Sequence, residues 1–433
     1  MPWQFLGKLV ILSAFLIGLV LPGITFVGTP TVSAANACTY TIPATLKKVD
    51  GLGNYANVKP GDTLCLPAGS RGILKIFNLH GTAGSPITIQ NSGGIVKFTG
   101  STAFLSILSS SYVRLTGAGV EDKCGAEYSP TEQACGIEFD HSYKGIIIDT
   151  NGADVHDFEI DHVLVHDTST QINSRGIAIH PLDRQIVSGL YAHHNYILNT
   201  FGEGLYIGTE PQKKPYDELG KMRNVEISYN LVEQTGYDGI KVKVGIENVA
   251  VHHNIVRNAG TRRVSKHESG IQLATSVGQV YNNYVAAILE GIATGRPLAN
   301  PGTRYFNNIV VGGQTSCIDA AESNPQIYNN TLVGCGTVGV KANGTSAQIF
   351  DNIVVNTSGT AINAPANTVF NNLTGSSSTA GFVNAAGGDY HLLANSPAVD
   401  AGRNSGLFPP FDYDDVSRPQ GAKTDLGAYE FVP

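Results

Sequence analysis

The chain has little charge, little tryptophan and little methionine. Charged residues make up 15% of its 433 residues, and there are one Trp and two Met, whereas Gly alone numbers 50. This composition is typical neither of a helical protein nor of a disordered one. No two cysteines have C-x-x-C spacing, which argues against a thiolate metal site. The formal net charge of −7 gives no overall attraction to nucleic acid or to an acidic polymer, so we expect no nucleic-acid partner and only local anion sites.

Only one hydrophobic run is long. Residues 1–35 contain Lys8, an apolar run from Leu9 to Val20, and a small-residue stretch that ends in TVSAANA. This order is typical of a secretory signal peptide with cleavage near Ala34 or Ala35, and an uncleaved membrane anchor is the alternative. We therefore expect a signal peptide at 1–35 and an exported, monomeric mature chain at 36–433. That chain would be secreted or attached to the cell surface, with no membrane contact after cleavage.

Export would place the six cysteines in an oxidising compartment, where disulfides form. Six cysteines permit 15 connectivities. Short separations favour Cys124–Cys135 and Cys317–Cys335, which leaves Cys38–Cys65.

An asparagine recurs at the end of short apolar segments. Its spacing falls from 35 residues to 20–25 toward the C-terminus. Repeats of this length without helical periodicity predict an all-β solenoid of stacked parallel strands, a β-helix in a single domain. Stacked side-chain amides at a turn, where Asn tolerates a left-handed backbone, explain the column without a ligand. The column comprises Asn195, Asn230, Asn254, Asn283, Asn308, Asn330, Asn352 and Asn372.

Two histidine pairs, His193–His194 and His252–His253, precede two of these asparagines. Other coils fill the first position of the pair with Ser228, Tyr281, Phe306, Tyr328 and Phe350, so a stacking column explains it. Residues 386–433 form a C-terminal closing segment, whose Asp400, Asp412, Asp414 and Asp415 we interpret as loop and cap residues.

A glycine marks one strand in each of five consecutive coils. The residues after it alternate, which predicts a strand with a buried face and a solvated face. Strands stacked about 4.8 Å apart would align their outward residues in columns. One column is Ala178, Tyr206, Lys241, Gln272 and Ala293, and the next is His180, Gly208, Lys243, Ala274 and Gly295. In the five coils, the residue directly before the glycine is Arg175, Glu203, Asp238, Ser269 or Glu290, respectively.

Two insertions, residues 209–223 and 259–268, flank this sheet, and insertions in solenoids gather on the binding face. They bring a local basic excess from Lys213, Lys214, Lys221, Arg223, Arg262, Arg263 and Lys266. We expect an acidic polysaccharide to bind here, contacted by His180, Gln272, Arg262, Arg263 and Lys266. A solvated charged loop without a ligand is the alternative.

The residues at the centre of the columns suit β-elimination. Lys241 and Lys243 share one strand face and would make each other's protonation less favourable. With one of these lysines as the base, and the other lysine and the Tyr206 phenol assisting, the site could remove the C5 proton of a uronate and expel the 4-linked sugar.

A divalent cation would assist this reaction by neutralising the uronate carboxyl. Asp238 and Glu203 are stacked one rung apart, and Glu268 belongs to the adjoining insertion. Carboxylate oxygens are the ligands that Ca²⁺ accepts, so we predict a calcium site at these three residues.

Two other functions suit the same residues. A glycoside hydrolase needs two carboxylic acids roughly 5–10 Å apart, which Asp238 with Glu203 or Glu290 could supply. A non-catalytic surface or adhesion protein would use the same charges as an ion-pair ladder or a glycan-binding face. Fold alone does not choose among the three.

The two ends of the chain resemble known exported proteins. The stretch VKPGDTLCLPAGSRGILKI, followed by GTAGSPITIQNSGG, resembles the opening coils of secreted β-helix polysaccharide lyases of the chondroitinase B and alginate lyase group. The C-terminal GDYHLLANSPAVDAG and RPQGAKTDLGAYEF are similar to the ending of many exported bacterial β-helix proteins. The resemblance implies a right-handed parallel β-helix of the pectin lyase-like kind over nearly the whole mature chain.

In those lyases one strand carries Ca²⁺-binding glutamates and, a few residues on, the lysine base. DGIKVK matches part of that pattern, which implies Asp238 as a ligand and Lys243 as the base. The second glutamate position holds Gly236, and Gln272 stands where the family has a catalytic arginine. Arg262 or Arg263 on the adjoining insertion would have to replace that arginine.

Overall fold

The structure is a computed structural model that describes residues 37–118, 123–171, 174–209, 215–295, 302–365, 368–403 and 408–433. The predicted signal peptide and the inserted Lys213 and Lys214 lie outside these residues. Among the described residues, no helix is long and apolar enough to cross a membrane.

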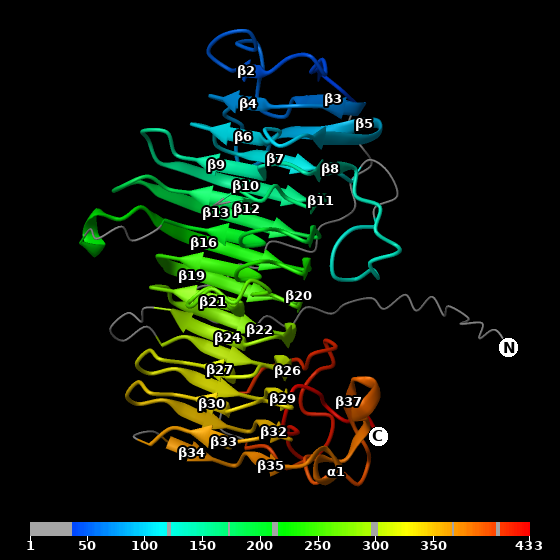
Figure 1. Ribbon diagram of the computed structural model, residues 1–433, viewed down its shortest axis with the longest axis vertical. Coiled ribbons are helices and arrows are strands. Elements are labelled where there is room, and N and C mark those ends of the chain that lie inside the picture. The colour runs from blue at the N-terminus through cyan, green and yellow to red at the C-terminus, as the bar shows by residue number, and fades with distance from the viewer. Residues whose placement is uncertain are drawn as a thin grey trace, which may run out of the picture. The chain divides into compact units, whose positions relative to one another are not determined.

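Short parallel strands stack coil upon coil in a right-handed parallel β-helix of one domain, as the repeats predict (Figure 1). One sheet contains 12 of the described strands. They are β2 (Lys48–Asp50), β4 (Leu74–Phe77), β6 (Leu105–Leu108), β9 (Lys144–Asp149), β12 (Arg175–His180), β15 (Leu205–Ile207), β18 (Ile240–Lys243), β21 (Ser269–Ala274), β24 (Glu290–Gly295), β27 (Ser316–Asp319), β30 (Val338–Lys341) and β33 (Thr360–Asn363).

The other large sheet consists of two stacks, which the long strands β3 (Thr63–Arg71) and β5 (Ile87–Thr99) join because each runs through both. The first stack adds β1 (Tyr40–Thr41), β7 (Val113–Thr116), β10 (Val155–Asp161), β13 (Ile186–His193), β16 (Lys221–Ser228), β19 (Gly245–His252), β22 (Gly278–Tyr281), β25 (Arg304–Phe306), β28 (Gln326–Tyr328), β31 (Gln348–Phe350) and β34 (Thr368–Phe370). The second adds β8 (Ile137–Asp140), β11 (Val163–His166), β14 (Tyr196–Leu198), β17 (Leu231–Glu233), β20 (Ile255–Arg257), β23 (Tyr284–Ala287), β26 (Ile309–Gly312), β29 (Thr331–Val333), β32 (Ile353–Val355) and β35 (Leu373–Gly375).

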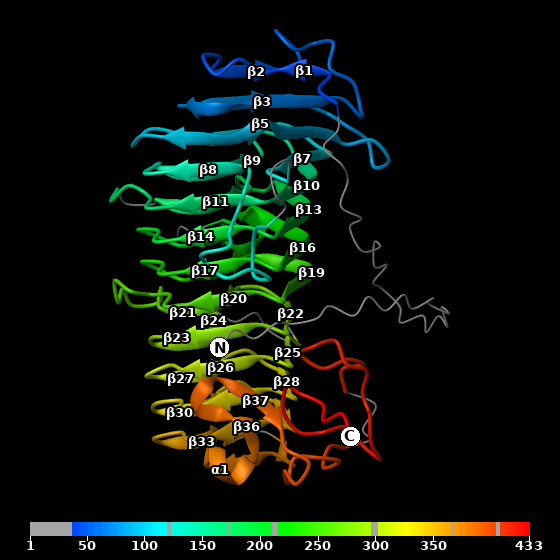
Figure 2. The ribbon, with the colours of Figure 1, turned by 90° about the vertical axis from the view of Figure 1, so that its right-hand side faces the viewer.

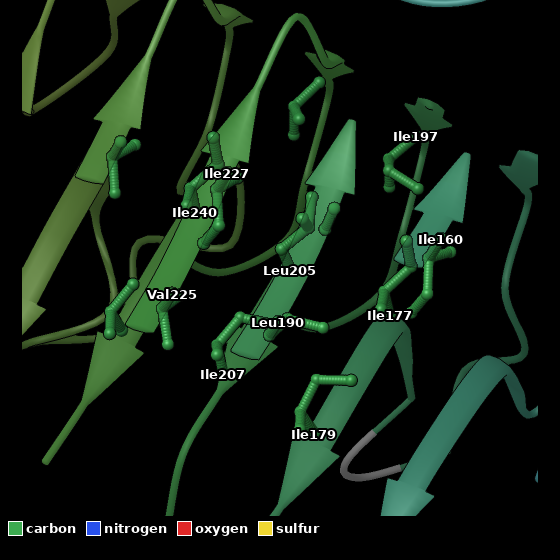
Figure 3. Packing of buried hydrophobic residues seen from close by; sticks show 14 of the residues in the cluster. Ile160, Ile177, Ile179, Leu190, Ile197, Leu205, Ile207, Val225, Ile227 and Ile240 are labelled. Atoms are coloured by element: carbon green, nitrogen blue, oxygen red, sulfur yellow. The ribbon is translucent and has the colours of Figure 1, made fainter. Parts of the chain in front are cut away.

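The core is the interior of the coils. Inward-facing residues of the 12-stranded sheet align, and Ile177, Leu205, Ile240 and Ile271 are fully buried. Side chains of the other sheet approach them from the opposite wall (Figure 3). Glycine is required where the walls come closest, because a Cβ at Gly239 would lie 2.5 Å from Val256 Cγ1. These contacts explain why each repeat combines β-branched residues with a glycine.

The asparagine column is a hydrogen-bonded ladder. From Asn195 to Asn372, each Nδ2 donates to the Oδ1 of the asparagine in the next coil at 2.9–3.0 Å. We expected the left-handed backbone at these asparagines themselves, and this expectation is wrong. It belongs to the residue before each of them, such as His194 (φ 49°) and Asn282 (φ 50°). Beside the ladder, rings from His252 to Phe370 stack with centroids 4.7–5.2 Å apart, which confirms a stacking column.

All three favoured disulfides are confirmed: Cys38–Cys65, Cys124–Cys135 and Cys317–Cys335. Outside the coils lie η1 (Tyr216–Glu218), α1 (Ser377–Ala380), η2 (Ala385–Gly387) and the antiparallel pair β36 (Phe382–Asn384) and β37 (Asp389–Leu392).

The C-terminal segment also lies along the later coils, where it is coloured orange and red (Figures 1 and 2). Nδ2 of Asn282 and of Asn329 donates to the carbonyls of Asp412 and Asp425, at 3.0 and 2.9 Å. Asp412 acts as a loop residue, because its Oδ1 accepts hydrogen bonds from the backbone of Asp414 and Val416.

Candidate functional site

The predicted column from Ala178 to Ala293 exists, because these residues pair in register across β12, β15, β18, β21 and β24. It is not solvated, however. Tyr206, Lys241 and Gln272 are at most 5% exposed, so the prediction of a solvated face is wrong here. The insertion covers part of the column, since the Lys266 carbonyl accepts hydrogen bonds from Lys241 Nζ at 3.4 Å and Gln272 Nε2 at 3.5 Å.

Four charged side chains are buried side by side on this face. Arg175, Glu203, Asp238 and Lys241 are 5%, 1%, 0% and 2% exposed. Arg175 Nε donates to Glu203 Oε2 at 3.0 Å, and Lys241 Nζ donates to Asp238 Oδ2 at 2.5 Å. Burying ions is unfavourable unless they are paired, so two anions and two cations here form a charge-balanced cluster. Arg175 was not among the expected site residues, although it stands in the same column as Glu203.

His267 lies between this cluster and solvent. Its Nδ1 is 3.3 Å from Glu203 Oε1, 3.7 Å from Asp238 Oδ2 and 3.2 Å from Lys241 Nζ, and its side chain is 28% exposed. The ring of Tyr237 packs against it with centroids 5.0 Å apart. Sequence reasoning missed His267, and the only indication of its role was its place within the basic insertion.

The two buried carboxyl groups are tuned in opposite directions. At Glu203, burial disfavours ionisation, but the close approach of His267 and the charges of Arg175 and Lys241 outweigh it and lower the pKa to about 2. At Asp238, complete burial is the largest effect and raises the pKa, while the charge and hydrogen bond of Lys241 oppose it. Neighbouring carboxyl groups with divergent pKa values are typical of catalytic sites.

The ring of Tyr206 lies against Lys243, Arg175 and His180. The Arg175 guanidinium lies 3.8 Å from the centre of its ring, Lys243 Nζ lies 5.2 Å away, and the His180 ring meets it edge-on at 5.5 Å. Burial, together with the charges of Arg175 and Lys144, lowers the pKa of His180 to about 3. Its Nε2 therefore accepts a hydrogen bond from Arg175 at 3.2 Å. Lys243 is half-buried, whereas Tyr206 is fully buried.

Arg262 is held between two aromatic rings at the edge of the site. Its guanidinium lies 3.7 Å from the ring centre of Phe201 and 5.1 Å from that of Tyr237. A Cβ at Gly236 would lie 2.9 Å from Arg262 Cδ and 2.1 Å from the Phe201 carbonyl, so this arrangement requires glycine there. Arg262 is exposed and makes no ion pair within the described part of the chain. Its guanidinium is thus oriented and available to an anion.

The structure places three other expected residues apart from the cluster. Arg263 donates to Gln314 Oε1 at 3.1 Å, toward a later coil. The side chain of Lys266 is exposed, and only its carbonyl meets the cluster. Glu268 is half-buried and does not belong to the group that could hold a metal ion.

Three groups among the described residues could hold a metal ion, and the one at this site consists of Glu203, Asp238 and His267, whose ligand atoms lie within 4.8 Å of one another. The other two are Glu138, Asp140 and His166, and Glu159, Asp161 and His193. This spacing of acidic and imidazole groups is compatible with a metal ion. The contacts are less suitable for calcium, which takes 6–8 oxygen ligands. Lys241 already contacts Asp238 and His267, and Arg175 contacts Glu203. These residues therefore fit a metal in spacing but offer Ca²⁺ few unoccupied oxygens.

No family model and no curated protein matches this chain. Solved structures do match it. A GH136 lacto-N-biosidase from Eubacterium ramulus aligns with a TM-score of 0.52 and 13% identity over 78% of this chain and 68% of that one. Pectate lyase Pel9A aligns with a TM-score of 0.44 and 14% identity over 92% and 97% of the two chains. The PL6 family alginate lyase AlyGC aligns with a TM-score of 0.45 and 14% identity over 76% and 51%. At these identities the similarity concerns the fold alone, a pectin lyase-like β-helix.

Proposed function

We propose that this protein is an exported enzyme that cleaves uronate-containing polysaccharide by β-elimination. The observation that supports it best is the burial of Arg175, Glu203, Asp238 and Lys241 on the sheet face that also carries the half-buried Lys243, whose Nζ lies 5.2 Å from the centre of the Tyr206 ring. A solubilising ladder of ions would be exposed and would gain little from this costly burial. Buried, mutually perturbed charges next to an accessible amine are instead typical of a catalytic centre.

In this proposal Lys243 is the base. Its neutral amine takes the C5 proton, and the C5–H electron pair forms the C4=C5 double bond. The C4–O bond to the next sugar breaks at the same time, and the departing oxygen takes a proton from solvent. Lys241 and Tyr206 are too deeply buried to touch a polymer, so they would act as positioning residues.

The uronate carboxylate must be neutralised for its C5 proton to become acidic. Arg262, with its stacked and exposed guanidinium, is the group that we assign to this task. Calcium, which the sequence predicts, would have to compete with Lys241 for Asp238. We therefore assign neutralisation of the uronate carboxylate to cationic side chains. A chelator distinguishes this assignment from neutralisation by calcium, because it would lower the activity only if calcium is required.

Export is supported by the three disulfides, which account for all six cysteines. Disulfides persist outside the cytosol, where polymeric substrates are also found.

The test is to mix the purified mature protein with pectate, alginate and chondroitin, with and without a chelator. β-Elimination creates an unsaturated uronate that absorbs ultraviolet light, so absorbance should rise with at least one polymer. No rise with any uronate, together with no new reducing ends, would favour the non-catalytic binding protein.

Glycoside hydrolysis is the second candidate, and the opposite pKa shifts of Glu203 and Asp238 favour it. Their ligand oxygens lie within 4.8 Å, close to the separation of about 5–5.5 Å in retaining glycosidases. Both carboxyl groups are covered by Arg175, Lys241 and His267, which makes attack on a sugar less direct. New reducing ends without ultraviolet absorbance would identify hydrolysis.

A further inference from the structure

We infer that Lys241 is a built-in cation that takes the place of a divalent metal ion at Glu203, Asp238 and His267. The native protein would then bind no calcium at this group, and removal of the ammonium would create a calcium site. The inference concerns binding and does not depend on the proposed reaction.

The first argument is the set of contacts around Lys241 Nζ. An ammonium has three donors. Three acceptor atoms surround this one: Asp238 Oδ2 at 2.5 Å, His267 Nδ1 at 3.2 Å and the Lys266 carbonyl at 3.4 Å. Two of these atoms belong to the group that could hold a metal. The ammonium therefore already uses the ligands that an ion would need.

The second argument is charge. With Asp238 ionised, its negative charge and that of Glu203 are balanced by Lys241 and Arg175, all four at most 6% exposed. Adding Ca²⁺ would leave a net charge of +2 in a region with little access to water, which is strongly unfavourable. Without the lysine, the same group would have one unpaired buried carboxylate beside a second carboxylate and an imidazole.

The third argument is that all but one of the carboxylate oxygens of the group are already engaged. Asp238 Oδ1 accepts a hydrogen bond from the Ser269 backbone at 2.9 Å, and Glu203 Oε2 accepts one from Arg175 at 3.0 Å. Within the described residues, Glu203 Oε1 accepts no hydrogen bond and lies 3.3 Å from His267 Nδ1, and removal of the ammonium would free Asp238 Oδ2 beside it. The native group therefore favours its own ammonium over the ion.

The experiment compares the melting temperature Tm of the wild-type protein and of Lys241→Met with and without millimolar Ca²⁺. The Tm of the wild-type protein should not rise with Ca²⁺ through binding at Glu203, Asp238 and His267. Lys241→Met should melt lower, and Ca²⁺ should restore about 3 °C or more, as expected for a ligand well above its Kd. Lys341→Met is the matched control, because Lys341 belongs to the same column and pairs with Asp319 at 2.7 Å. Its Tm should gain no Ca²⁺ dependence.

Tb³⁺ luminescence gives a second measurement that does not require the lysine variant to fold. Tb³⁺ binds calcium sites, and Tyr237 beside His267 would sensitise it. The wild-type emission should equal that of Asp238→Asn. Two results for the wild-type protein would overturn the inference: Tb³⁺ emission above that of Asp238→Asn, or a rise of Tm with Ca²⁺ that Asp238→Asn abolishes. A folded Lys241→Met variant whose Tm does not rise with Ca²⁺ would also overturn it. Because no polymer is used, these results are independent of whether the protein is a lyase.

Discussion

Lys241 Nζ lies 2.5 Å from Asp238 Oδ2, and the two side chains are 2% and 0% exposed. Lys241→Met leaves the Asp238 carboxylate buried without its partner, which typically costs about 3–5 kcal/mol. We therefore expect the free energy of unfolding, measured in urea without added metal, to fall by about that amount.

The control for this prediction is Lys341→Met. Lys341 and Asp319 are paired at 2.7 Å but are 36% and 16% exposed, so the pair should contribute only about 0–1 kcal/mol. Equal losses of stability in the two variants would show that the burial of Lys241 has no special consequence.

Lys243 is the proposed base, and Lys243→Ala should lower the rate of unsaturated uronate formation by about 100- to 10,000-fold. Because Lys243 is half-buried and outside the charge-balanced cluster, its loss should change the Tm little. Lys341→Ala removes a lysine from the same sheet and should keep full activity. Activity close to wild type in Lys243→Ala would reject Lys243 as the base.

Arg262 should set the affinity for the acidic substrate. Arg262→Ala removes the guanidinium that Phe201 and Tyr237 orient, so KM should rise about tenfold, which corresponds to roughly 1.4 kcal/mol. Arg262→Lys should fall in between, because it keeps the charge but loses the planar fork.

Arg263→Ala is the neighbouring control, since Arg263 bonds to Gln314 instead. A KM that is the same in Arg262→Ala and Arg263→Ala would mean that Arg262 does not bind the carboxylate.

His180 should make stability depend on pH. Burial and the charges of Arg175 and Lys144 lower its native pKa from 6.5 to about 3, against the opposing charge of Glu203. Between these values the unfolded chain binds a proton that the native protein does not. The native state therefore loses stability as pH falls from 6.5 toward 3, and gains it in the reverse direction.

His180→Gln should flatten this dependence, most visibly between pH 6.5 and 5, above the titration of most carboxyl groups. Unfolding in urea at several pH values measures it. An identical slope in wild type and His180→Gln would show that the imidazole is not held neutral by its surroundings.

The fold could be predicted from the sequence because it is periodic. Stacking repeats the same contact in every coil, so the asparagine ladder and the register of Tyr206, Lys241 and Gln272 follow from spacing alone. Short separations likewise favoured the correct disulfides, because coils bring nearby cysteines together.

The site could be predicted only in part, because its decisive contacts are not periodic. Alternation predicted that Lys241 would be solvated, but the backbone of the insertion at Lys266 covers it. Nothing in the spacing indicated that His267 would reach Glu203, or that Arg263 would turn toward Gln314. Such contacts depend on how a single insertion folds against one coil.

The most direct test of this account is the ultraviolet absorbance of the mature protein mixed with uronate polymers, with and without a chelator. Our account predicts a rise with at least one of pectate, alginate or chondroitin, and the same rate after chelation, because Arg262 neutralises the uronate carboxylate and Lys241 occupies the place of a metal ion. No rise in ultraviolet absorbance with any of these polymers would contradict the proposed β-elimination. A rate of absorbance increase that the chelator abolishes and Ca²⁺ restores would contradict the role of Lys241 as a built-in cation.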